Sequence, residues 1–503
     1  MRTVPFSVFA EILKDLTVSA SGNGSVQAAT IANDSRKVES GTLFCAIRGA
    51  KNDGHLFLPD AAEKGACAFI TAADSSWNPP DGRPVLRVRD SYLAWARICE
   101  TFYDRPADGM DVYAVTGTNG KTTIAYLLNR IFRNAWPEQN CGLLSTVKYD
   151  TGDGDGLEAA RTTPDAESFQ RLFARMKQNH CSRAVMELSS HGLHQHRTGS
   201  LAFAGAVFTN LTGDHLDYHG TMENYYQAKR ILFADLLRPG APAIINADDE
   251  YGRRLRTELS GSGGHEVHSV SLLNEPGANI AVKELSLTSS GAEFLLCTPW
   301  GSQRMKSTLI GDYNVCNLAL ASALALAQGV SWDVLLRTAA ERGIAPPGRL
   351  EVLEIAEGVR ALVDYAHTDD ALFRVLSALH GVAERRIITV FGCGGDRDKS
   401  KRPRMAAVAA ELSDLVIITS DNPRTEDPMA IIEDIRAGIP ENCICMVEPD
   451  RAAALQLAAD LAEPGDLVLA AGKGHENYQE INGKKYPLDD RQVIREIRGR
   501  SMK

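Results

Sequence analysis

Residues 111–132, DVYAVTGTNGKTTIAYLLNRIF, decide the fold of the region around them. They begin with a short run typical of a buried strand, pass through a glycine-containing loop and continue as a helix with one apolar face. Gly117 and Gly120 allow backbone N–H groups to close around phosphate oxygens. Lys121 supplies a positive charge to the β- and γ-phosphates, and Thr122 at the helix N-terminus can ligate Mg²⁺. The stretch predicts a triphosphate site.

This loop is a shortened P-loop. The usual pattern places a glycine six residues before the lysine, where this chain has Val115. The difference argues against motor and GTPase families. The alternative, a chance glycine-rich turn, does not explain why Lys121 and Thr122 both fit the chemistry.

Length and composition limit the number of domains, the class of protein and the kinds of partner. The 503 residues exceed one core of ordinary size, so about three domains are expected. A hydrophobic fraction of 44% and a charged fraction of 23% are those of a globular protein. The net charge of -10 does not attract nucleic acid, and no basic run indicates a membrane patch. We expect a monomer with no nucleic-acid or membrane partner. The uncharged stretch 313–332 is expected to be a buried helix.

The cysteines and the amino terminus predict a cytoplasmic location. The ten cysteines are scattered, and the nearest pair, Cys443 and Cys445, lacks the spacing of a redox motif or a zinc knuckle. Glu11, Lys14 and Asp15 interrupt any signal-peptide core. Reduced thiols and no export are therefore expected.

Turn signals and strand rhythm divide the chain into three regions. Residues 1–106 predict a small α/β domain, and residues 107–345 predict a central domain around the P-loop. A Pro-Pro-Gly cluster at 346–348 marks the boundary with residues 346–503. This last region holds four apolar runs that end in polar or glycine-rich loops, ALVDYAH, RIITVFGCGG, LVIITSDNP and DLVLAAGKG. They predict a doubly wound sheet, which binds ligands at the carboxyl ends of its strands.

Three motifs, TGTNGKTT (116–123), DHLDYHG (214–220) and GDYNVCN (311–317), resemble the Mur ligase family of ATP-dependent amino-acid-adding enzymes. The likeness covers essentially the whole chain. NDSRKV, RTTPDA, MELSSHGLHQHR, GCGGDRDKSKRP, SDNPRTEDP and AGKGHENYQ resemble the members that extend a UDP-N-acetylmuramoyl dipeptide. The resemblance implies a three-domain α/β architecture with a central P-loop ATPase-like domain and a Rossmann-like carboxyl-terminal domain.

The resemblance also implies a reaction. ATP phosphorylates a substrate carboxylate, an incoming amine attacks the acyl phosphate, and phosphate leaves from a tetrahedral intermediate. Each step gathers negative charge, so cations must surround the reacting groups.

Catalytic and metal-binding roles follow from the same resemblance. Lys121 is the phosphate-binding cation, while Glu187 and His215 are expected to hold Mg²⁺ together with Thr122. Lys229 matches a lysine that carries CO₂ as a carbamate in similar ligases, which converts a cation into an oxygen ligand. From the residues alone, Lys229 would be a solvated helix residue and DHLDYH a solvated loop or a zinc site. No thiolate partners that loop, and Mg²⁺ prefers oxygen-rich ligand sets.

The expected ATP contacts lie on both sides of the gap between the central and carboxyl-terminal domains. Taken singly, Arg349 could be a hinge residue, and Asp364 or His367 an ordinary polar group at a strand end. Asp369 stands in HTDDAL where the family often has proline, which is expected to affect loop rigidity and not the reaction. The ATP contacts are Gly117, Thr118, Asn119, Gly120, Lys121, Thr122, Thr123, Asn314, Arg349, Asp364 and His367.

Hydroxyls, an amide and a guanidinium suit the anionic nucleotide-peptide precursor. Arg161 stands where relatives commonly have asparagine, which leaves one polar contact open. The precursor contacts implied by the resemblance are Ser35, Thr162, Thr163, Ser189, Gln195 and Arg197.

The DNPR motif predicts the amino acid that is added. Meso-diaminopimelate differs from lysine by a distal carboxylate, and a planar guanidinium suits a carboxylate. In similar enzymes DNPR accompanies diaminopimelate, and lysine-adding relatives lack this arginine. Alternatively, the arginine only caps its loop or pairs with Glu426 or Asp427. The expected amino-acid contacts are Arg397, Asp421, Asn422, Pro423, Arg424, Gly472 and Glu476.

Other functions remain open at this point. The same ligase could add lysine, or a related enzyme could extend folate with glutamate. A P-loop regulator could hydrolyse ATP without forming an amide, and a structural homologue could be inactive. The retained Lys121, Glu187, His215 and Lys229 argue against the inactive form.

Overall fold

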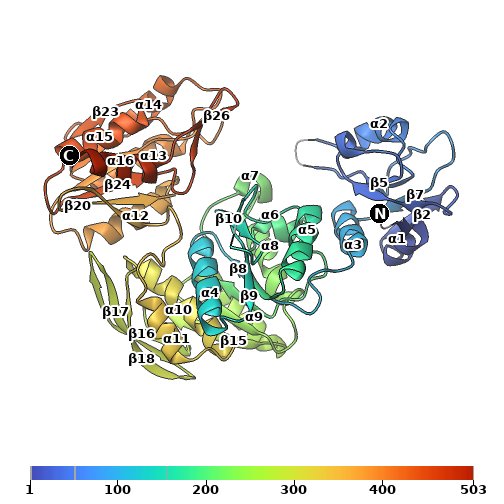
Figure 1. Cartoon of the computed structure of the whole chain (residues 1–503), viewed down its shortest axis with the longest axis horizontal. Helices are drawn as coiled ribbons and strands as arrows, with labels where there is room; N and C mark the ends of the chain where they lie inside the picture. Colours follow the sequence, from blue (N-terminus) through green and yellow to red (C-terminus); the bar gives the residue numbers. More distant parts are fainter. Residues whose placement is uncertain (1–2, 50–51, 155, 502–503) are drawn as a thin grey trace. The chain divides into compact units, whose positions relative to one another are not determined.

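The computed structural model describes residues 3–49, 52–154 and 156–501 (Figure 1). The chain forms two compact units. Unit 1 comprises Met1–Gly117, Trp136–Ala243 and Thr257–Val267, and unit 2 comprises Thr118–Ala135, Ile244–Arg256 and His268–Lys503. The division falls inside β14 (Pro242–Asn246), α9 (Glu250–Ser262) and β15 (Glu266–Ser271). The predicted limits of three domains stay a prediction.

A mostly parallel sheet organises the first region of unit 1. Its order is β2-β7-β6-β5-β4, and only the pairing of β2 with β7 is antiparallel among the pairs described. Apolar side chains of α3 pack on one face and those of α2 on the other. The elements are β1 (Val4–Pro5), α1 (Phe6–Ile12), β2 (Thr17–Ser21), β3 (Gln27–Ala28), β4 (Thr30–Ala32), η1 (Ser35–Lys37), β5 (Thr42–Cys45), η2 (Gly54–Phe57), α2 (Leu58–Glu63), β6 (Ala68–Ala72), β7 (Val85–Val88) and α3 (Ser91–Phe102).

The rest of unit 1 brings three strand ends to one edge of a sheet. β9 pairs parallel to β12, β12 to β8, and β8 to β13. Parallel strands share their direction, so the loops after β8, β12 and β13 leave from the same edge. The elements are β8 (Asp111–Thr116), β9 (Asn140–Leu144), β10 (Lys148–Asp150), β11 (Leu157–Glu158), α5 (Ala166–Gln178), β12 (Cys181–Glu187), α6 (Ser190–His194), β13 (Gly205–Phe208), α7 (Leu216–His219) and α8 (Met222–Ala234).

Unit 2 contains the helix that follows the P-loop and an antiparallel set of strands. Helix α4 begins at Lys121, as the sequence predicted, and packs against α10. The uncharged stretch 313–332 lies mainly in α10, which is buried along most of its length. In the described ranges, no helix is both long enough and apolar enough to cross a membrane. The elements are α4 (Lys121–Ala135), β16 (Ile280–Thr288), β17 (Gly291–Thr298), β18 (Gly301–Ser307), α10 (Asp312–Ala327) and α11 (Trp332–Ala339).

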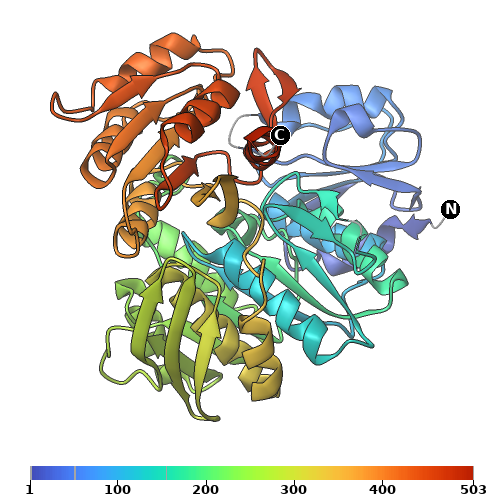
Figure 2. The same ribbon diagram turned by 60° about the vertical axis from the view of Figure 1, so that its left-hand side comes forward.

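The carboxyl-terminal part of unit 2 is a doubly wound sheet with helices on both faces (Figure 2). Its order is β19-β20-β24-β21-β22-β23, and only β19 is paired antiparallel. The four predicted apolar runs form β20, β21, β22 and β24. The elements are β19 (Glu351–Ala356), β20 (Val359–Asp364), α12 (Asp369–His380), β21 (Ile387–Phe391), α13 (Lys401–Leu412), β22 (Leu415–Ile418), α14 (Pro428–Arg436), β23 (Cys445–Val447), α15 (Arg451–Leu461), β24 (Leu467–Ala471), β25 (Tyr478–Ile481), β26 (Lys484–Pro487) and α16 (Asp490–Ser501).

Candidate active site

The loop between β8 and α4 has the backbone of a phosphate-binding loop. Gly117 and Gly120 have φ angles of 144° and 85°, in the region that favours glycine. A Cβ on Gly117 would lie 1.8 Å from Thr209 Oγ1, so no side chain fits there. Lys121 folds back and donates from Nζ to the Thr118 carbonyl at 2.7 Å. The loop thus ends at a helix N-terminus, where backbone N–H groups favour anions.

Lys229 reaches this loop from helix α8. Its side chain is almost fully buried, and its Nζ donates to the Gly117 carbonyl at 2.8 Å. The same nitrogen lies 4.6 Å from the ring centroid of Tyr225. Lys229 is therefore not the solvated helix residue that its local sequence suggests, and its amine lies at the first glycine of the P-loop.

Glu187 ends β12 with a fully buried carboxylate. The carboxylate accepts hydrogen bonds from the backbone N–H of Thr146 at 2.8 Å and from its hydroxyl at 3.1 Å. The neighbouring Thr116, at the end of β8, donates from its hydroxyl to the Leu188 carbonyl at 2.7 Å. The two Thr146 bonds hold the Glu187 carboxylate against the loop after β9, and the Thr116 bond joins the ends of β8 and β12.

Five of the six predicted precursor residues form one network around Glu187. Thr163 donates from its hydroxyl to the Glu187 carbonyl at 3.0 Å and accepts from the Ser189 backbone N–H at 2.9 Å. Thr162 accepts at 3.1 Å from the hydroxyl of Thr146, which also binds the Glu187 carboxylate.

Arg197 completes this network from the loop after α6. Its guanidinium donates to the Thr163 carbonyl at 2.8 Å and to Gln195 Oε1 at 2.7 Å. Burial and the nearby charge of Arg161 lower the pKa of Arg197. An enclosed guanidinium held by carbonyl and amide oxygens suits an anionic ligand.

Ser35, the sixth precursor residue, lies in a different element. It begins η1, is buried, and its carbonyl accepts from Lys64 Nζ at 3.0 Å. Its role in precursor binding stays a prediction.

His215 lies in a left-handed conformation (φ 54°) just before α7. Its ring makes an edge contact with that of His191 at a centroid distance of 4.9 Å. Burial, followed by the neighbouring His215, lowers the pKa of His191 to about 4. In the described part of the chain, no three His, Cys, Asp or Glu side chains are grouped to hold a metal ion. The predicted magnesium ligands include Thr122 and a modified Lys229, so that assignment stays a prediction.

Two of the predicted ATP contacts organise the start of the carboxyl-terminal sheet. The Asp364 carboxylate accepts from the backbone N–H groups of Leu350 at 2.7 Å and Ala366 at 2.8 Å. Burial raises the pKa of Asp364. The Arg349 guanidinium lies 4.6 Å from the Tyr365 ring centroid, and its Nη2 is 3.5 Å from Thr122 Oγ1.

The remaining predicted ATP contacts also have defined partners. Asn314 Nδ2 donates to the Ile310 carbonyl at 2.9 Å, and Asn119 Nδ2 donates to Asp370 Oδ2 at 3.3 Å. His367 Nδ1 lies 2.8 Å from the Tyr365 carbonyl oxygen. Thr118 and Gly120 lie in the loop before α4, and Thr123 lies in the first turn of that helix.

Asp369, which was predicted to affect the rigidity of its loop, lies at the start of a capped helix, and its effect on rigidity stays a prediction. It is the first residue of α12, and Thr368 caps that helix. Its carboxylate accepts from Arg404 Nε at 2.9 Å. Both proline and aspartate are suited to the first helical turn, so the helix begins normally.

The predicted amino-acid residues gather at the carboxyl ends of β21, β22 and β24. Asn422 donates from Nδ2 to Glu476 Oε2 at 2.8 Å. A Cβ on Gly472 would lie 2.7 Å from Asp421 Oδ2, so the loop after β24 approaches the DNPR loop closely. A Cβ added on Gly394 would lie 2.9 Å from Arg424 Nη1 and 4.0 Å from Arg397 Cγ, so both arginines lie close to that glycine. Pro423 lies between Asn422 and Arg424.

Sequence reasoning missed two charged residues in this cluster. Lys473 is fully buried and contacts Asn422 and Glu476. Glu480 in β25 accepts from Arg424 Nε at 3.1 Å. The position of Lys473 between Gly472 and Gly474 was an available signal, whereas nothing local marks Glu480.

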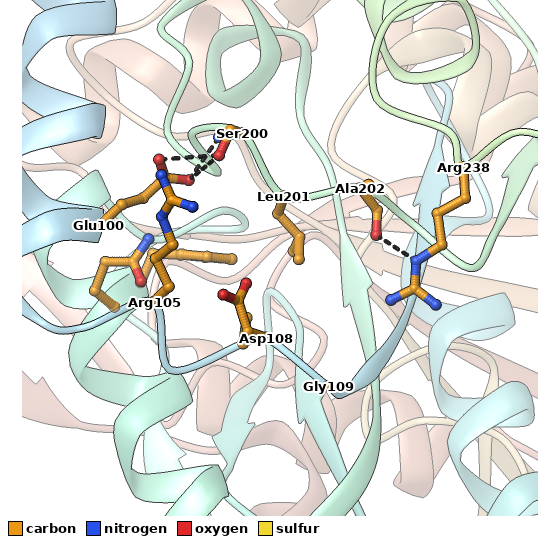
Figure 3. A pocket seen from close by; sticks show the side chains of 11 residues that line it. Glu100, Arg105, Asp108, Gly109, Ser200, Leu201, Ala202 and Arg238 are labelled. Carbon is orange, nitrogen blue, oxygen red and sulfur yellow. Dashed lines mark hydrogen bonds between the residues drawn. The ribbon is translucent and has the colours of Figure 1, made fainter. Parts of the chain in front are cut away.

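A separate cavity of about 270 Å³ lies in unit 1 (Figure 3). Glu100 of α3 is 6% exposed there and accepts from the Ser200 backbone N–H at 2.6 Å and from its hydroxyl at 3.0 Å. Burial raises the pKa of Glu100. None of the predicted ligand contacts lines this cavity. It is lined by Glu100, Arg105, Ala107, Asp108, Gly109, Phe169, Gln170, Ser200, Leu201, Ala202 and Arg238.

Comparison with known families agrees with this geometry. The Mur ligase family, catalytic domain matches residues 28–103, the Mur ligase middle domain residues 115–325, and the Mur ligase, glutamate ligase domain residues 348–474. The chain therefore belongs to the Mur ligase family. This membership confirms the predicted α/β architecture and makes the chain an ATP-dependent ligase.

Particular relatives are similar along almost the entire chain. The UDP-N-acetylmuramoyl-L-alanyl-D-glutamate--2,6-diaminopimelate ligase of Gloeobacter violaceus is 42% identical over 472 residues, covering 94% of both chains. The ligase of that name from Bacteroides thetaiotaomicron is 42% identical over 493 residues, covering 97% of this chain and 99% of the relative.

Solved structures show the same relationship. A UDP-N-acetylmuramoyl-L-alanyl-D-glutamate--2,6-diaminopimelate ligase aligns over 100% of both chains with a TM-score of 0.70 and 32% identity. A folylpolyglutamate synthase from Mycobacterium tuberculosis has a TM-score of 0.62 at 18% identity, over 76% of this chain and 92% of that one. The second likeness shows a shared fold alone.

Proposed function

We propose that this chain joins meso-diaminopimelate to UDP-N-acetylmuramoyl-L-alanyl-D-glutamate in an ATP-dependent step of peptidoglycan precursor synthesis. One observation carries the proposal. The DNPR loop, Gly472 and Glu476 converge at one edge of the carboxyl-terminal sheet. They do so in a chain that is 42% identical, over 94% of its length, to a ligase named for 2,6-diaminopimelate.

The chemistry assigns a task to each set of residues. The terminal phosphoryl group of ATP passes to a carboxylate oxygen of the precursor, giving an acyl phosphate and ADP. The amine of diaminopimelate, after losing a proton, attacks the carbonyl carbon, and the C–O bond to phosphate breaks. Lys121 and the loop N–H groups stabilise the transferring charge, while Arg197 and its hydroxyl-bearing neighbours orient the precursor.

Thr122 and Glu187 offer oxygen donors of the kind that magnesium prefers. Thr122 offers a hydroxyl, and Glu187 offers a carboxylate held in place by Thr146. We propose that these residues and His215 hold Mg²⁺, which when bound neutralises phosphate charge. Lys229 in its carbamate form would add oxygen ligands. Its enclosed amine beside Gly117 supports that role, because it lies at the phosphate-binding loop.

The residues proposed to bind the amino acid offer a positive partner to its distal carboxylate and a negative partner to an ammonium group. Arg424 is proposed to receive the distal carboxylate, with Arg397 nearby, and Glu476 to face an ammonium group. This arrangement favours diaminopimelate over lysine, which lacks the second carboxylate. A cytoplasmic, monomeric enzyme acting on these small molecules is part of the proposal.

The test is ADP release by the purified chain. We expect release only when ATP, Mg²⁺, the UDP-linked dipeptide and meso-diaminopimelate are all present, with a product heavier by one diaminopimelate residue. Replacing diaminopimelate by lysine should lower the rate strongly. ADP release that needs neither precursor nor amino acid would favour a P-loop regulator, and preference for lysine would overturn the specificity.

A further inference from the structure

Strand β25 lies along the DNPR loop. Gln479 donates from Nε2 to the Asp421 carbonyl at 2.7 Å, and the backbone N–H of Glu480 donates to Asn422 Oδ1 at 2.9 Å. The strand thus contacts two successive residues of the loop. β25 pairs with β26 as an antiparallel hairpin, so these contacts come from a defined element.

The backbone of Arg424 is held by β25 and by the turn that follows it. Its N–H donates to the Glu480 carbonyl at 3.0 Å, and its carbonyl accepts from the Asn482 N–H at 2.7 Å. Arg424 has a φ of 51°, a left-handed conformation that is unfavourable for a residue with a side chain. Such a conformation persists where surrounding contacts impose it. The hairpin provides those contacts.

The Arg424 side chain is also fixed at two points. Its Nε donates to Glu480 Oε2 at 3.1 Å, and its Nη1 donates to the Gly395 carbonyl at 2.7 Å. A guanidinium has five N–H groups, so these bonds leave donors at its Nη edge for a ligand. The side chains of Arg424 and Glu480 are 21% and 29% exposed, so solvent screens this pair only in part.

We infer that Glu480 is a positioning residue that sets the specificity of the amino-acid site. Its carboxylate fixes the rotation of the guanidinium, so that the Nη edge of Arg424 is presented to the distal carboxylate of diaminopimelate. This inference rests on the proposed function. It assigns no contact between Glu480 and substrate.

A competing effect predicts the opposite result. If Glu480 mainly occupied Arg424 in place of the substrate, removing its carboxylate would improve diaminopimelate binding. The contact geometry argues against this, because Glu480 accepts from Nε and not from the Nη groups, of which Nη1 also donates to the Gly395 carbonyl. Whether KM for diaminopimelate rises or falls when the Glu480 carboxylate is removed therefore distinguishes the two effects.

The experiment compares Glu480→Ala, Glu480→Gln and the control Lys484→Ala from the same hairpin. For Glu480→Ala we expect kcat/KM for diaminopimelate relative to lysine to fall about five- to tenfold, a partial loss of a charge-assisted contact. The loss should be in KM for diaminopimelate, with KM for ATP and for the precursor unchanged. Glu480→Gln keeps an acceptor oxygen and should recover part of the ratio. Lys484→Ala should match wild type.

Each outcome decides the inference. A ratio within twofold of wild type in Glu480→Ala, or a lower KM for diaminopimelate, overturns it. Equal rises in all three KM values would show general damage to the fold and also overturn it. A wild-type enzyme that prefers lysine refutes the proposed substrate before any variant is made, so the two failures are distinguishable.

Discussion

Lys473, with a fully buried side chain, holds its ammonium nitrogen 3.2 Å from the carboxylate of Glu476. The same nitrogen donates to Asn422 Oδ1 at 3.3 Å and to the Tyr478 carbonyl. These acceptors match the three N–H donors of an ammonium group. One buried cation thus joins the DNPR loop to the loop after β24.

Lys473→Met should therefore damage amino-acid binding and local stability together. Removing one partner of a buried pair costs about 3–5 kcal/mol, less here because Glu476 is partly exposed. We expect a lower unfolding midpoint and a raised KM for diaminopimelate, measured by urea titration and by steady-state kinetics. Lys484→Met is the matched control. A variant with wild-type KM for diaminopimelate would contradict the assigned role of Lys473.

Lys121→Ala should abolish ligation, because the transferring phosphoryl group loses its main protein cation. The measurement is ADP formation with all substrates present. Lys177→Ala, an exposed lysine near the end of α5, serves as the control and should retain full activity. Near-normal turnover in Lys121→Ala would refute the phosphate role.

Lys229→Ala should be severely impaired and partly rescued by small carboxylates such as formate or acetate, because these can replace carbamate oxygens. Depleting bicarbonate should lower wild-type activity and leave the variant unchanged. A mass increase of one CO₂ on the peptide containing Lys229, after chemical trapping, would support the modification. Unchanged turnover in both the variant and the depleted wild type would refute the carbamate.

Arg424→Ala should weaken diaminopimelate use by roughly tenfold to a hundredfold, because a charge-assisted hydrogen bond contributes about 1.5–3 kcal/mol. Lysine should gain relative to diaminopimelate, and a competition assay with both amino acids measures this directly. If both substrates lost activity equally, Arg424 would be maintaining the loop and not selecting the substrate.

Glu100 predicts a specific dependence of stability on pH. Burial raises its pKa above the ordinary value of 4.5, so the folded state binds the proton more tightly than the unfolded state. Its contribution to stability therefore decreases as pH rises from 4.5 through the raised pKa, and then levels off. Glu100→Gln removes this dependence of the free energy of unfolding on pH, because glutamine does not titrate.

The difference in urea midpoint between Glu100→Gln and wild type should shift in favour of the variant as pH rises across that window. Glu63→Gln, at an exposed position in α2, controls for a change of net charge. A difference that stays constant from pH 4.5 to neutrality would show that Glu100 does not titrate in this way.

The parts of the site that sequence could predict are those carried by contiguous motifs. TGTNGKTT contains its own loop and helix start, and DNPR follows a recognisable apolar run, so both were placed correctly on strand ends. Lys229 needed the family resemblance, since its helix reads as partly solvated and only tertiary packing against Gly117 buries it. The ligand roles of these residues stay predictions.

Other contacts depend on pairings that no local pattern encodes. Glu480 meets Arg424 only because a hairpin 56 residues further along the chain folds back onto the DNPR loop. Thr146 meets Glu187 across neighbouring strands, 41 residues apart. In both cases a residue in an ordinary stretch gains its contacts from long-range topology.

The hairpin β25–β26 also bears on how the enzyme is made. In the sequence, the hairpin comes after all the central strands of the carboxyl-terminal sheet. Its Glu480 and Asn482 nevertheless hold the backbone of Arg424, which lies before the last of those strands. During synthesis, the nucleotide-binding loop can form long before these residues leave the ribosome. The bonds that hold the backbone of Arg424 can therefore form only after the central strands of this sheet have all been synthesised.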